Sequence, residues 1–259
     1  MIQLYLYCYN EELIIENTIL HYKKMFPTIQ ITILDNESTD KSAEIARNLG
    51  CTIKTIDTGN ILNIFTFHNI RNELWRTSSA DWIIICDMDE YLCMNQKDLD
   101  DEEKNGTTLI KTQGYNMVGD SHSPVLDDIK IGEIDKGFKD NHYSKTICFN
   151  RNFIHHMRYG AGGHKCFPVG QRVQYSNKTY PLYHFKYLGF EYLFQNYKIN
   201  FNRSHAMREH GMSLHYNDDK GKIRKTMEDV NKKARHLPSL YKIDSPQVQD
   251  YISNESSLH

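Results

Sequence analysis

The chain has 259 residues, of which 39% are hydrophobic and 25% are charged, and its formal net charge is −2. This length suits one large α/β domain or two small ones, and we expect one main core. A charge so close to zero argues against non-specific adhesion to nucleic acid or to an anionic membrane, so no nucleic-acid partner is expected.

The cysteines and the first residues bear on the compartment. None of the six cysteines forms a Cys-x-x-Cys pair, and two sit in or beside apolar strand-like runs, as buried reduced thiols do. The opening MIQLYLYC reads as a strand without a signal peptide, and no window reaches 18 apolar residues. We expect a soluble cytoplasmic protein with no membrane span, which meets a membrane only through its surface or a partner. Its oligomeric state is open, with a homo-oligomer as one option.

Strand-like and helix-like segments alternate up to about residue 115. Strands are predicted over 2–8, 29–34, 51–56 and 82–86, with helices between them after Asn10, over 40–50 and over 67–79. Asn10 is expected to cap the first helix and Gly50 to close the second. Apolar strands joined by helices predict a parallel sheet covered on both faces, which binds ligands beyond the carboxyl ends of its strands.

The alternation breaks down from about 115 to 180. This stretch is rich in Asp, Gly, Lys and His and predicts loops with short strands, an insertion that builds a site rather than a core. Helical spacing returns over 189–211 and 220–237, and the tail after about 244 is polar. We therefore divide the chain into an α/β half over 1–115, a loop-rich half of the same domain over 116–188, and C-terminal helices with a tail over 189–259.

In the stretch ADWIIICDMDEYL, residues 80–92, an apolar strand is followed by Asp87, Asp89 and Glu90. Asp87 and Asp89 can face one point, because side chains two apart on a strand point the same way and lie roughly 7 Å apart. Two carboxylates at that distance repel by roughly 2 kcal/mol at an effective dielectric near 20, and a divalent cation between them removes this cost. The alternative is that Asp87 caps the next segment while Asp89 is solvated.

Polar side chains also end the first two strands, in CYNEE (8–12) and LDNESTDKS (34–42). Carboxylates and amides at neighbouring strand ends are suited to bind a base and a ribose, because they accept from a ring N–H or from sugar hydroxyls. These two loops are therefore expected to lie near a nucleoside.

The combination of CYNEE, LDNESTDKSAEIA and WIIICDMDEYL, at spacings of roughly 25 and 50 residues, resembles the nucleotide-diphosphosugar glycosyltransferases of the GT-A fold, especially family 2. The resemblance covers residues 1–115 best. It implies a Rossmann-like, mainly parallel sheet flanked by helices, a nucleotide-sugar donor such as a UDP-sugar, and Mn2+ or Mg2+. The implied reaction moves a sugar to an acceptor hydroxyl, for example of a glycan.

The same resemblance implies roles for single residues near the donor. Tyr9 and residues 10–12, with Asn10 and Glu12, match the loop that meets the nucleoside. Asp35 matches the acid that reads the uracil or ribose; beside it, Asn36 stands where an acid is common and Glu37 where glycine is common. Arg71 would reach the nucleotide or its diphosphate, the alternative being a surface arginine on an amphipathic helix.

The resemblance also implies a metal site. Asp87, Met88 and Asp89 would surround the metal and the diphosphate, with Asp89 as the direct metal ligand. His184 in YHFKY would complete the coordination, although a lone histidine is as often a structural residue. His164 and Lys165 in GAGGHKC would border the donor phosphate or the acceptor pocket.

The catalytic base and the reaction class are less constrained. Four acids are open as the base, namely Asp120, Glu133, Asp135 and Glu191. One rival is a nucleotidyltransferase, which would need a glycine-rich, basic loop after the first strand, where CYNEEL is acidic. A second rival is a non-enzymatic sugar-binding module, for which the 17 tyrosines offer stacking faces, although tyrosines in strands more often pack.

Overall fold

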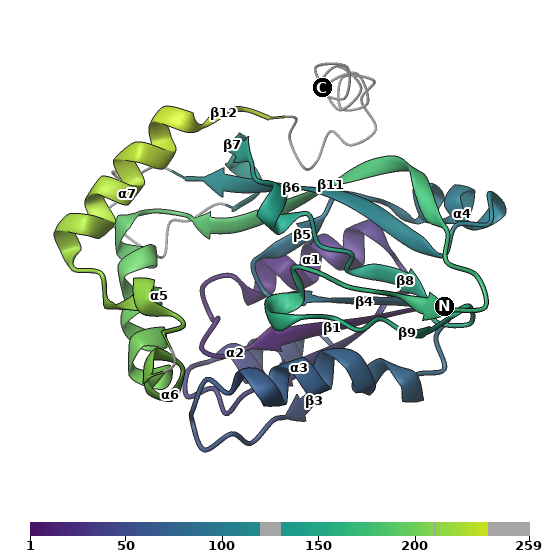
Figure 1. Ribbon diagram of the computed structural model, residues 1–259, viewed down its shortest axis with the longest axis horizontal. Coiled ribbons are helices and arrows are strands. Elements are labelled where there is room, and N and C mark those ends of the chain that lie inside the picture. The colour runs from purple at the N-terminus through teal and green to yellow at the C-terminus, as the bar shows by residue number, and fades with distance from the viewer. Residues whose placement is uncertain (120–130, 210, 238–259) are drawn as a thin grey trace.

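The computed structural model describes residues 1–119, 131–209 and 211–237, which build one large sheet flanked by helices (Figure 1). The helices are α1 (Ile15–Met25), α2 (Ser42–Asn48), α3 (Ile64–Glu73), α4 (Gln96–Lys104), α5 (Phe190–Arg203), α6 (His205–Glu209) and α7 (Lys220–Lys233). The strands are β1 (Ile2–Cys8), β2 (Gln30–Asp35), β3 (Thr52–Thr55), β4 (Trp82–Asp87), β5 (Glu90–Leu92), β6 (Leu109–Val118), β7 (Lys136–Lys139), β8 (Cys148–Asn150), β9 (Ile154–His156), β10 (Val169–Gly170), β11 (Tyr175–Tyr187) and β12 (Arg235–His236).

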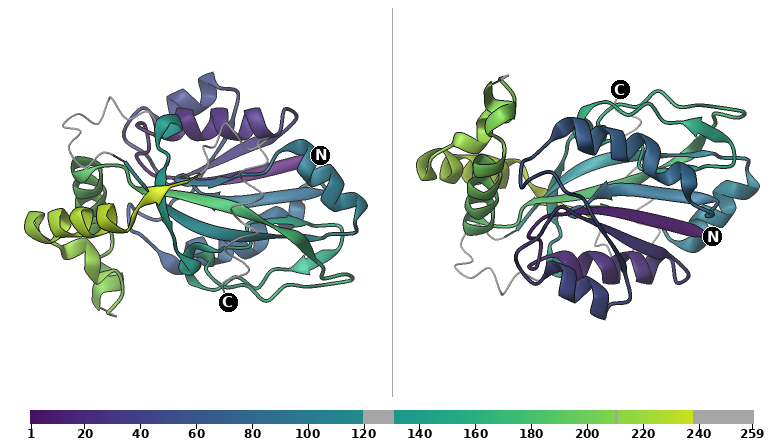
Figure 2. Two further views of the ribbon diagram at one scale, coloured as in Figure 1. Left: turned by 90° about the horizontal axis from the view of Figure 1, so that it is seen from above. Right: turned by 90° about the horizontal axis from the view of Figure 1, so that it is seen from below.

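The main sheet has the strand order β12-β7-β6-β8-β4-β1-β2-β3, and β11 pairs with both β6 and β5. The pairs β1/β2, β1/β4, β2/β3 and β6/β11 are parallel, whereas β5, β7, β8 and β12 join in antiparallel fashion. Helices α1 and α2 cover one face of the sheet and α3 covers the other (Figure 2). The predicted α/β class, with a sheet of parallel central strands flanked by helices, is confirmed.

Alternation along the central strands explains how helices come to cover both faces. Leu4 and Leu6 of β1 pack with Ile84 of β4 in the cluster under α1, while Tyr5 and Ile83 belong to the cluster on the opposite face. Side chains on a strand point alternately to its two faces, so a continuously apolar strand must be buried on both. Each fully buried aliphatic side chain of this kind contributes roughly 1.5–3 kcal/mol.

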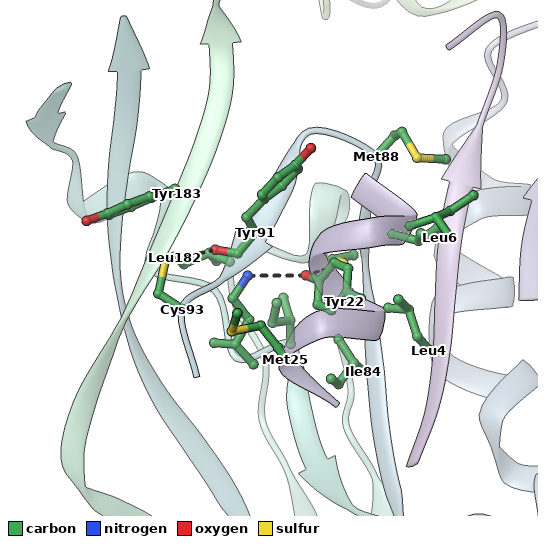
Figure 3. Packing of buried hydrophobic residues seen from close by; sticks show 14 of the residues in the cluster. Leu4, Leu6, Tyr22, Met25, Ile84, Met88, Tyr91, Cys93, Leu182 and Tyr183 are labelled. Carbon is green, nitrogen blue, oxygen red and sulfur yellow. Dashed lines mark hydrogen bonds between the residues drawn. The ribbon is translucent and has the colours of Figure 1, made fainter. Parts of the chain in front are cut away.

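Tyr22 ties α1 to the strands that carry the acids. Its ring packs among Leu4, Leu6 and Ile84 (Figure 3). Its hydroxyl donates to the carbonyl of Glu90 at 2.8 Å and accepts from the backbone N–H of Leu92 at 3.2 Å. A buried tyrosine hydroxyl needs such partners, and here they fix the turn between β4 and β5.

Two expectations for single elements were wrong. Helix α1 begins at Ile15, because Asn10 adopts a left-handed φ of 54° and its side chain accepts from the backbone N–H of Thr39 at 2.7 Å instead of capping the helix. The stretch from about 115 to 180 was expected to build a site rather than a core, yet its residues Ile147, Cys148 and Phe149 are fully buried. Cys148 and Phe149 lie in β8, which pairs with the central strand β4 and so becomes part of the core.

The C-terminal helices form a separate apolar cluster at one end of the sheet. Leu193 and Tyr197 of α5 pack against Ile223 and Met227 of α7, and Val118 at the end of β6 joins them. These helices therefore stand beyond the carboxyl ends of the parallel strands (Figure 1).

The structure also bears on the thiols and on membrane crossing. All six cysteines are free and all but Cys166 are buried, as predicted. Within the described ranges, none of the helices combines the length and the apolar character that crossing a bilayer requires.

Candidate active site

A cavity of about 580 Å³ opens at the carboxyl ends of β1 and β4. Its walls come from the ends of β1, β4 and β11, from the turns around residues 142–145 and 160–164, and from α5. Sheets of this kind bind ligands at this edge, and the volume is typical of a small-molecule site. Asp87 and Asp89, at the end of the apolar strand β4, thus lie in the wall of a cavity.

Asp87 ends β4 between two cations. Its Oδ1 accepts from Nη2 of Arg71 at 2.8 Å, and its Oδ2 accepts from Nζ of Lys145 at 2.9 Å. Nζ of Lys145 also lies 2.5 Å from Oε1 of Glu90, which is fully buried. Both carboxylate oxygens of Asp87 are therefore neutralised by side chains of the protein.

The protonation states follow from this arrangement. Burial raises the pKa of Asp87, but the ammonium of Lys145 and the guanidinium of Arg71 outweigh it and hold the pKa of Asp87 below its ordinary value. Burial raises the pKa of Glu90, and Lys145 counters only part of that shift. Burial lowers the pKa of Lys145, and the carboxylates of Asp87 and Glu90 reverse this, so that its pKa is raised and the ammonium stays charged.

Asp89 faces a different partner. The turn after β4 places its Oδ2 at 3.2 Å from Nε2 of His184 in β11, and its backbone carbonyl accepts from the N–H of Phe185 at 2.8 Å. Burial raises the pKa of Asp89, and the charge and hydrogen bond of His184 lower it below its ordinary value. Two of the three predicted metal ligands, Asp89 and His184, thus lie in direct contact.

Asn116 and Asp140 orient the imidazole of His184. Asn116 is the register partner of His184 on β6, and its Oδ1 lies 2.7 Å from Nδ1 of the ring. Its Nδ2 donates to Oδ2 of Asp140 at 2.8 Å. The amide of Asn116 is thereby oriented so that its oxygen, and not its nitrogen, faces His184. Because an amide oxygen only accepts, Nδ1 must carry the proton, and Nε2 presents either a second proton or a lone pair to Asp89.

This donor set fits a divalent cation in part. A lone pair facing a carboxylate is stable only with a cation or a proton between them, and metal-bound histidines usually donate their second N–H to a side chain in the way His184 does. Within the described residues, no three His, Cys, Asp or Glu side chains converge as a metal-binding group. Asp89 and His184 can therefore supply two ligands, and the remaining positions would fall to phosphate oxygens and water.

A glycine turn from residue 160 to 164 covers Arg71. Gly163 has a φ of 71°, and a Cβ at this position would lie 2.7 Å from Nη1 of Arg71. Gly162, with a φ of 64°, makes room in the same way for the ring of His164. Only glycine combines this backbone conformation with so close an approach.

Aromatic rings line the wall next to this turn. The imidazoles of His164 and His142 stack with centroids 3.8 Å apart, and the ring of Tyr143 stacks on His184 at 4.0 Å. Burial, with the positive charge of Lys145 next in weight, lowers the pKa of His164 to about 4, so this ring is neutral near pH 7. The cavity therefore has a flat aromatic side beside its charged one.

Tyr9 and Asn36 meet α5 at the other side of the cavity. The guanidinium of Arg203 lies 3.3 Å from the centre of the Tyr9 ring, and its Nη2 donates to Oδ1 of Asn36. Asn36 also donates to the carbonyl of Ile56 at 2.7 Å, which fixes the amide. The last turn of α5 thus joins the loops after β1 and β2.

The cavity brings together eight of the residues that sequence reasoning selected, namely Tyr9, Asn36, Arg71, Asp87, Met88, Asp89, His164 and His184. Met88 contributes little of its side chain, which is 2% exposed and packs in the core.

Four other selected residues do not line the cavity: Asn10, Glu12, Asp35 and Lys165. Three of them hold loops instead. Asn10 accepts from Thr39, Glu12 Oε2 accepts from the N–H of Lys41 at 3.1 Å, and Asp35 Oδ1 accepts from the N–H of Ser38 at 3.3 Å. Lys165 is exposed.

Sequence reasoning missed several residues of the cavity. Lys145 stands alone before a short strand and gives no signal, and Arg203 lies 167 positions from its partner Asn36. Lys186 could have been found, because it follows His184 by two positions and so points to the same face of the strand. In the loop of residues 10–12, Glu11 is the member that lines the cavity.

The acids considered as a catalytic base lie elsewhere or cannot be placed. Asp120 falls outside the described residues. Asp135 contacts His236 at 3.0 Å and Glu191 accepts from Gln195 at 3.0 Å, and neither of them nor Glu133 lines the cavity. Of the described acids, Glu11, Asp87 and Asp89 do, and burial followed by the nearby charge of Asp89 raises the pKa of Glu11 well above its ordinary value.

The sequence comparisons point to one family. Residues 5–93 match the family model described as glycosyl transferase family 2. A stretch of 49 residues is 39% identical to Protein RfbJ of Shigella flexneri, which corresponds to 19% of this chain and 38% of that protein. The chain therefore matches well under half of the length of this relative.

Solved structures give more distant similarities. TarS of S. aureus in complex with UDP-GlcNAc is 12% identical with a TM-score of 0.41, over 90% of this chain and 72% of that one. Glucosyl-3-phosphoglycerate synthase from Mycobacterium tuberculosis, in complex with Mn2+, UDP and glucosyl-3-phosphoglycerate, is 18% identical with a TM-score of 0.31 over 44% of each chain. Residues 5–93, which match this family model, run from β1 through β5 and contain the three described acids of the cavity.

Proposed function

We propose that the protein transfers a sugar from a UDP-sugar to an acceptor hydroxyl, for example of a glycan, in a reaction that needs Mn2+ or Mg2+. The observation that carries this proposal is the contact between Oδ2 of Asp89 and Nε2 of His184 at 3.2 Å, in the wall of a cavity to which the family-matched residues 5–93 contribute. A divalent cation at this pair would stabilise the negative charge that develops on the leaving diphosphate.

The residues around this pair would bind and orient the donor. Asp89 and His184 would hold the cation, with the ring fixed through Asn116. Lys145 and Arg71 would add positive charge beside the diphosphate, while their contacts with Asp87 keep them in place. Tyr9 and Asn36 would face the nucleoside, as the family resemblance implies, and α5 would close that side of the cavity.

An inverting reaction would need a carboxylate that accepts the proton of the acceptor hydroxyl. Three described acids line the cavity, and Glu11 is the one to which we assign neither a cation nor a histidine as partner. Its raised pKa suits a proton acceptor near neutral pH better than the lowered pKa values of Asp87 and Asp89. Glu11 is thus our candidate base.

The proposal is tested by incubating the protein with a panel of radiolabelled nucleotide sugars and Mn2+, with and without a chelator. We expect slow hydrolysis of one donor. The chelator should abolish this hydrolysis, and the Asp89→Ala variant should not catalyse it. Binding of free sugars without cleavage of any donor would support the sugar-binding module instead. Release of pyrophosphate from a nucleoside triphosphate and a sugar phosphate would support the nucleotidyltransferase.

A further inference from the structure

The chain distributes its charge unevenly. Residues 141–190 contain seven Lys and Arg residues and five His residues, and no Asp or Glu, although the whole chain has a formal net charge of −2. Part of this positive charge serves the cavity through Lys145 and Lys186. Further cations lie outside it, on a hairpin and on the chain that follows, so the near-neutral total hides a basic surface.

This hairpin is formed by β9 and β10. Val169 is the register partner of His156, and the backbone N–H groups of Phe167 and Gln171 donate to the carbonyls of Met157 at 2.9 Å and Phe153 at 2.8 Å. A Cβ at Gly170 would lie 1.9 Å from the carbonyl oxygen of Phe153, which shows how closely the two arms pack. The fold therefore holds residues 153–158 against residues 167–171.

The hairpin and the chain after it expose apolar side chains. Phe167 is 66% exposed, Val173 46%, Tyr175 41% and Val169 40%. The surrounding residues His155, His156, Arg158, Arg172 and Lys178 are exposed as well. We call these nine residues the hairpin surface.

The positive charges of the hairpin surface are not neutralised by acids of the described chain. Among the described residues, no carboxylate lies within ion-pair distance of Arg158, Arg172 or Lys178, and Arg172 instead lies 4.0 Å over the ring of Phe153. Two neighbouring acids, Asp81 and Glu103, bind other groups. Asp81 binds the N-terminal amine at 2.8 Å and Asn152 at 2.9 Å, and Glu103 accepts from Trp82 at 3.2 Å.

We propose that the hairpin surface binds the face of an anionic lipid bilayer. Unpaired cations are attracted to anionic headgroups, and exposed Phe, Tyr and Val side chains gain by entering the headgroup layer. A soluble polyanion would need the cations alone and would leave Phe167 and Val173 without a role. None of these nine residues lines the cavity, and β9 lies on the side of the N-terminus, away from α5–α7 (Figure 1).

The test is co-sedimentation of the full chain with vesicles. We expect binding to vesicles of phosphatidylcholine mixed with phosphatidylglycerol and little to phosphatidylcholine alone. Each removed cation should weaken binding roughly fivefold, so the double variant Arg172→Gln/Lys178→Gln should lose roughly 25-fold. Phe167→Ser/Val173→Ser should lose roughly tenfold or more.

The matched control is Lys225→Gln/Lys233→Gln, which removes two exposed cations from α7 and should leave vesicle binding unchanged. Melting temperatures and UDP binding of all variants verify that fold and cavity are intact. Three results would overturn the proposal: no preference for anionic vesicles, an equal loss in the α7 control, or full binding by the Phe167→Ser/Val173→Ser variant. The last, together with charge-dependent binding to polyphosphate, would identify a site for polyanions instead.

Discussion

Asn116 determines which nitrogen of His184 faces Asp89. The two residues are register partners on β6 and β11, and the amide oxygen of Asn116 lies 2.7 Å from Nδ1 of the ring. This leaves Nε2 as the atom next to the Asp89 carboxylate at 3.2 Å. Asn116 therefore supports the pair that we propose as metal ligands.

This relationship predicts that Asn116→Ala weakens Mn2+ binding roughly tenfold or more, because the ring loses the acceptor that fixes its tautomer and orientation. Manganese affinity can be measured by electron paramagnetic resonance titration. Gln113→Ala, on the same strand but outside the cavity, is the control and should bind Mn2+ like the wild type. Equal affinity in Asn116→Ala and wild type would remove Asn116 from the site.

Lys145 should be the most sensitive position of the site for stability. Its side chain is 2% exposed and neutralises Asp87 and Glu90, so Lys145→Met would leave the fully buried carboxylate of Glu90 without its cation, at a cost of about 3–5 kcal/mol. Urea denaturation measures this loss, and the exposed Lys225→Met is the control. The double variant Lys145→Met/Glu90→Gln should recover part of the stability. A loss below about 1 kcal/mol would mean that Lys145 is not needed to compensate these charges.

Tyr9 and Arg203 should act together in nucleotide binding. Their stacked contact at 3.3 Å predicts that Tyr9→Ala and Arg203→Ala each weaken UDP binding, and that the double variant loses less than the sum of both. A coupling free energy of about 0.5–2 kcal/mol is expected from calorimetric titrations of the four proteins. Additive losses would show that the two residues contribute independently.

His21 should make stability depend on pH. Burial lowers its pKa to about 4, although the hydrogen bond with the carbonyl of Leu92 opposes the shift. The unfolded chain then binds a proton near pH 6.5 and the folded chain does not, so this stabilisation is complete above pH 6.5 and is lost as the pH falls toward 4.

The expected loss over this range is about 3 kcal/mol. Urea denaturation at several pH values should therefore give a steeper acid slope for the wild type than for His21→Gln. His155→Gln, which changes an exposed histidine, should keep the wild-type slope. Parallel slopes for His21→Gln and wild type would contradict the assignment.

The sequence was most informative where local pattern and fold coincide. The apolar run before Asp87 predicted β4, and both Asp87 and Asp89 line the cavity. The expected period of two did not hold for Asp89, because the strand ends at Asp87 and Asp89 lies in the following turn. It was least informative where the site depends on long-range contacts. Lys145 is 58 positions from Asp87 and Arg203 is 167 positions from Asn36, and no local periodicity encodes such pairs.

The two acids also turned out to have different surroundings, which spacing alone could not show. Asp87 is occupied by Arg71 and Lys145, whereas Asp89 faces His184. The sequence predicted a cation between Asp87 and Asp89, whereas we propose that the cation binds between Asp89 and His184.

A crystal structure of the protein with Mn2+ and UDP, with anomalous scattering measured for manganese, tests this account most directly. We predict an anomalous peak that contacts a carboxylate oxygen of Asp89, Nε2 of His184 and the diphosphate, while Asp87 keeps its contacts with Arg71 and Lys145. Bound UDP with no peak at this pair, or a peak held by other residues while Asp89 and His184 remain in direct contact, would contradict it.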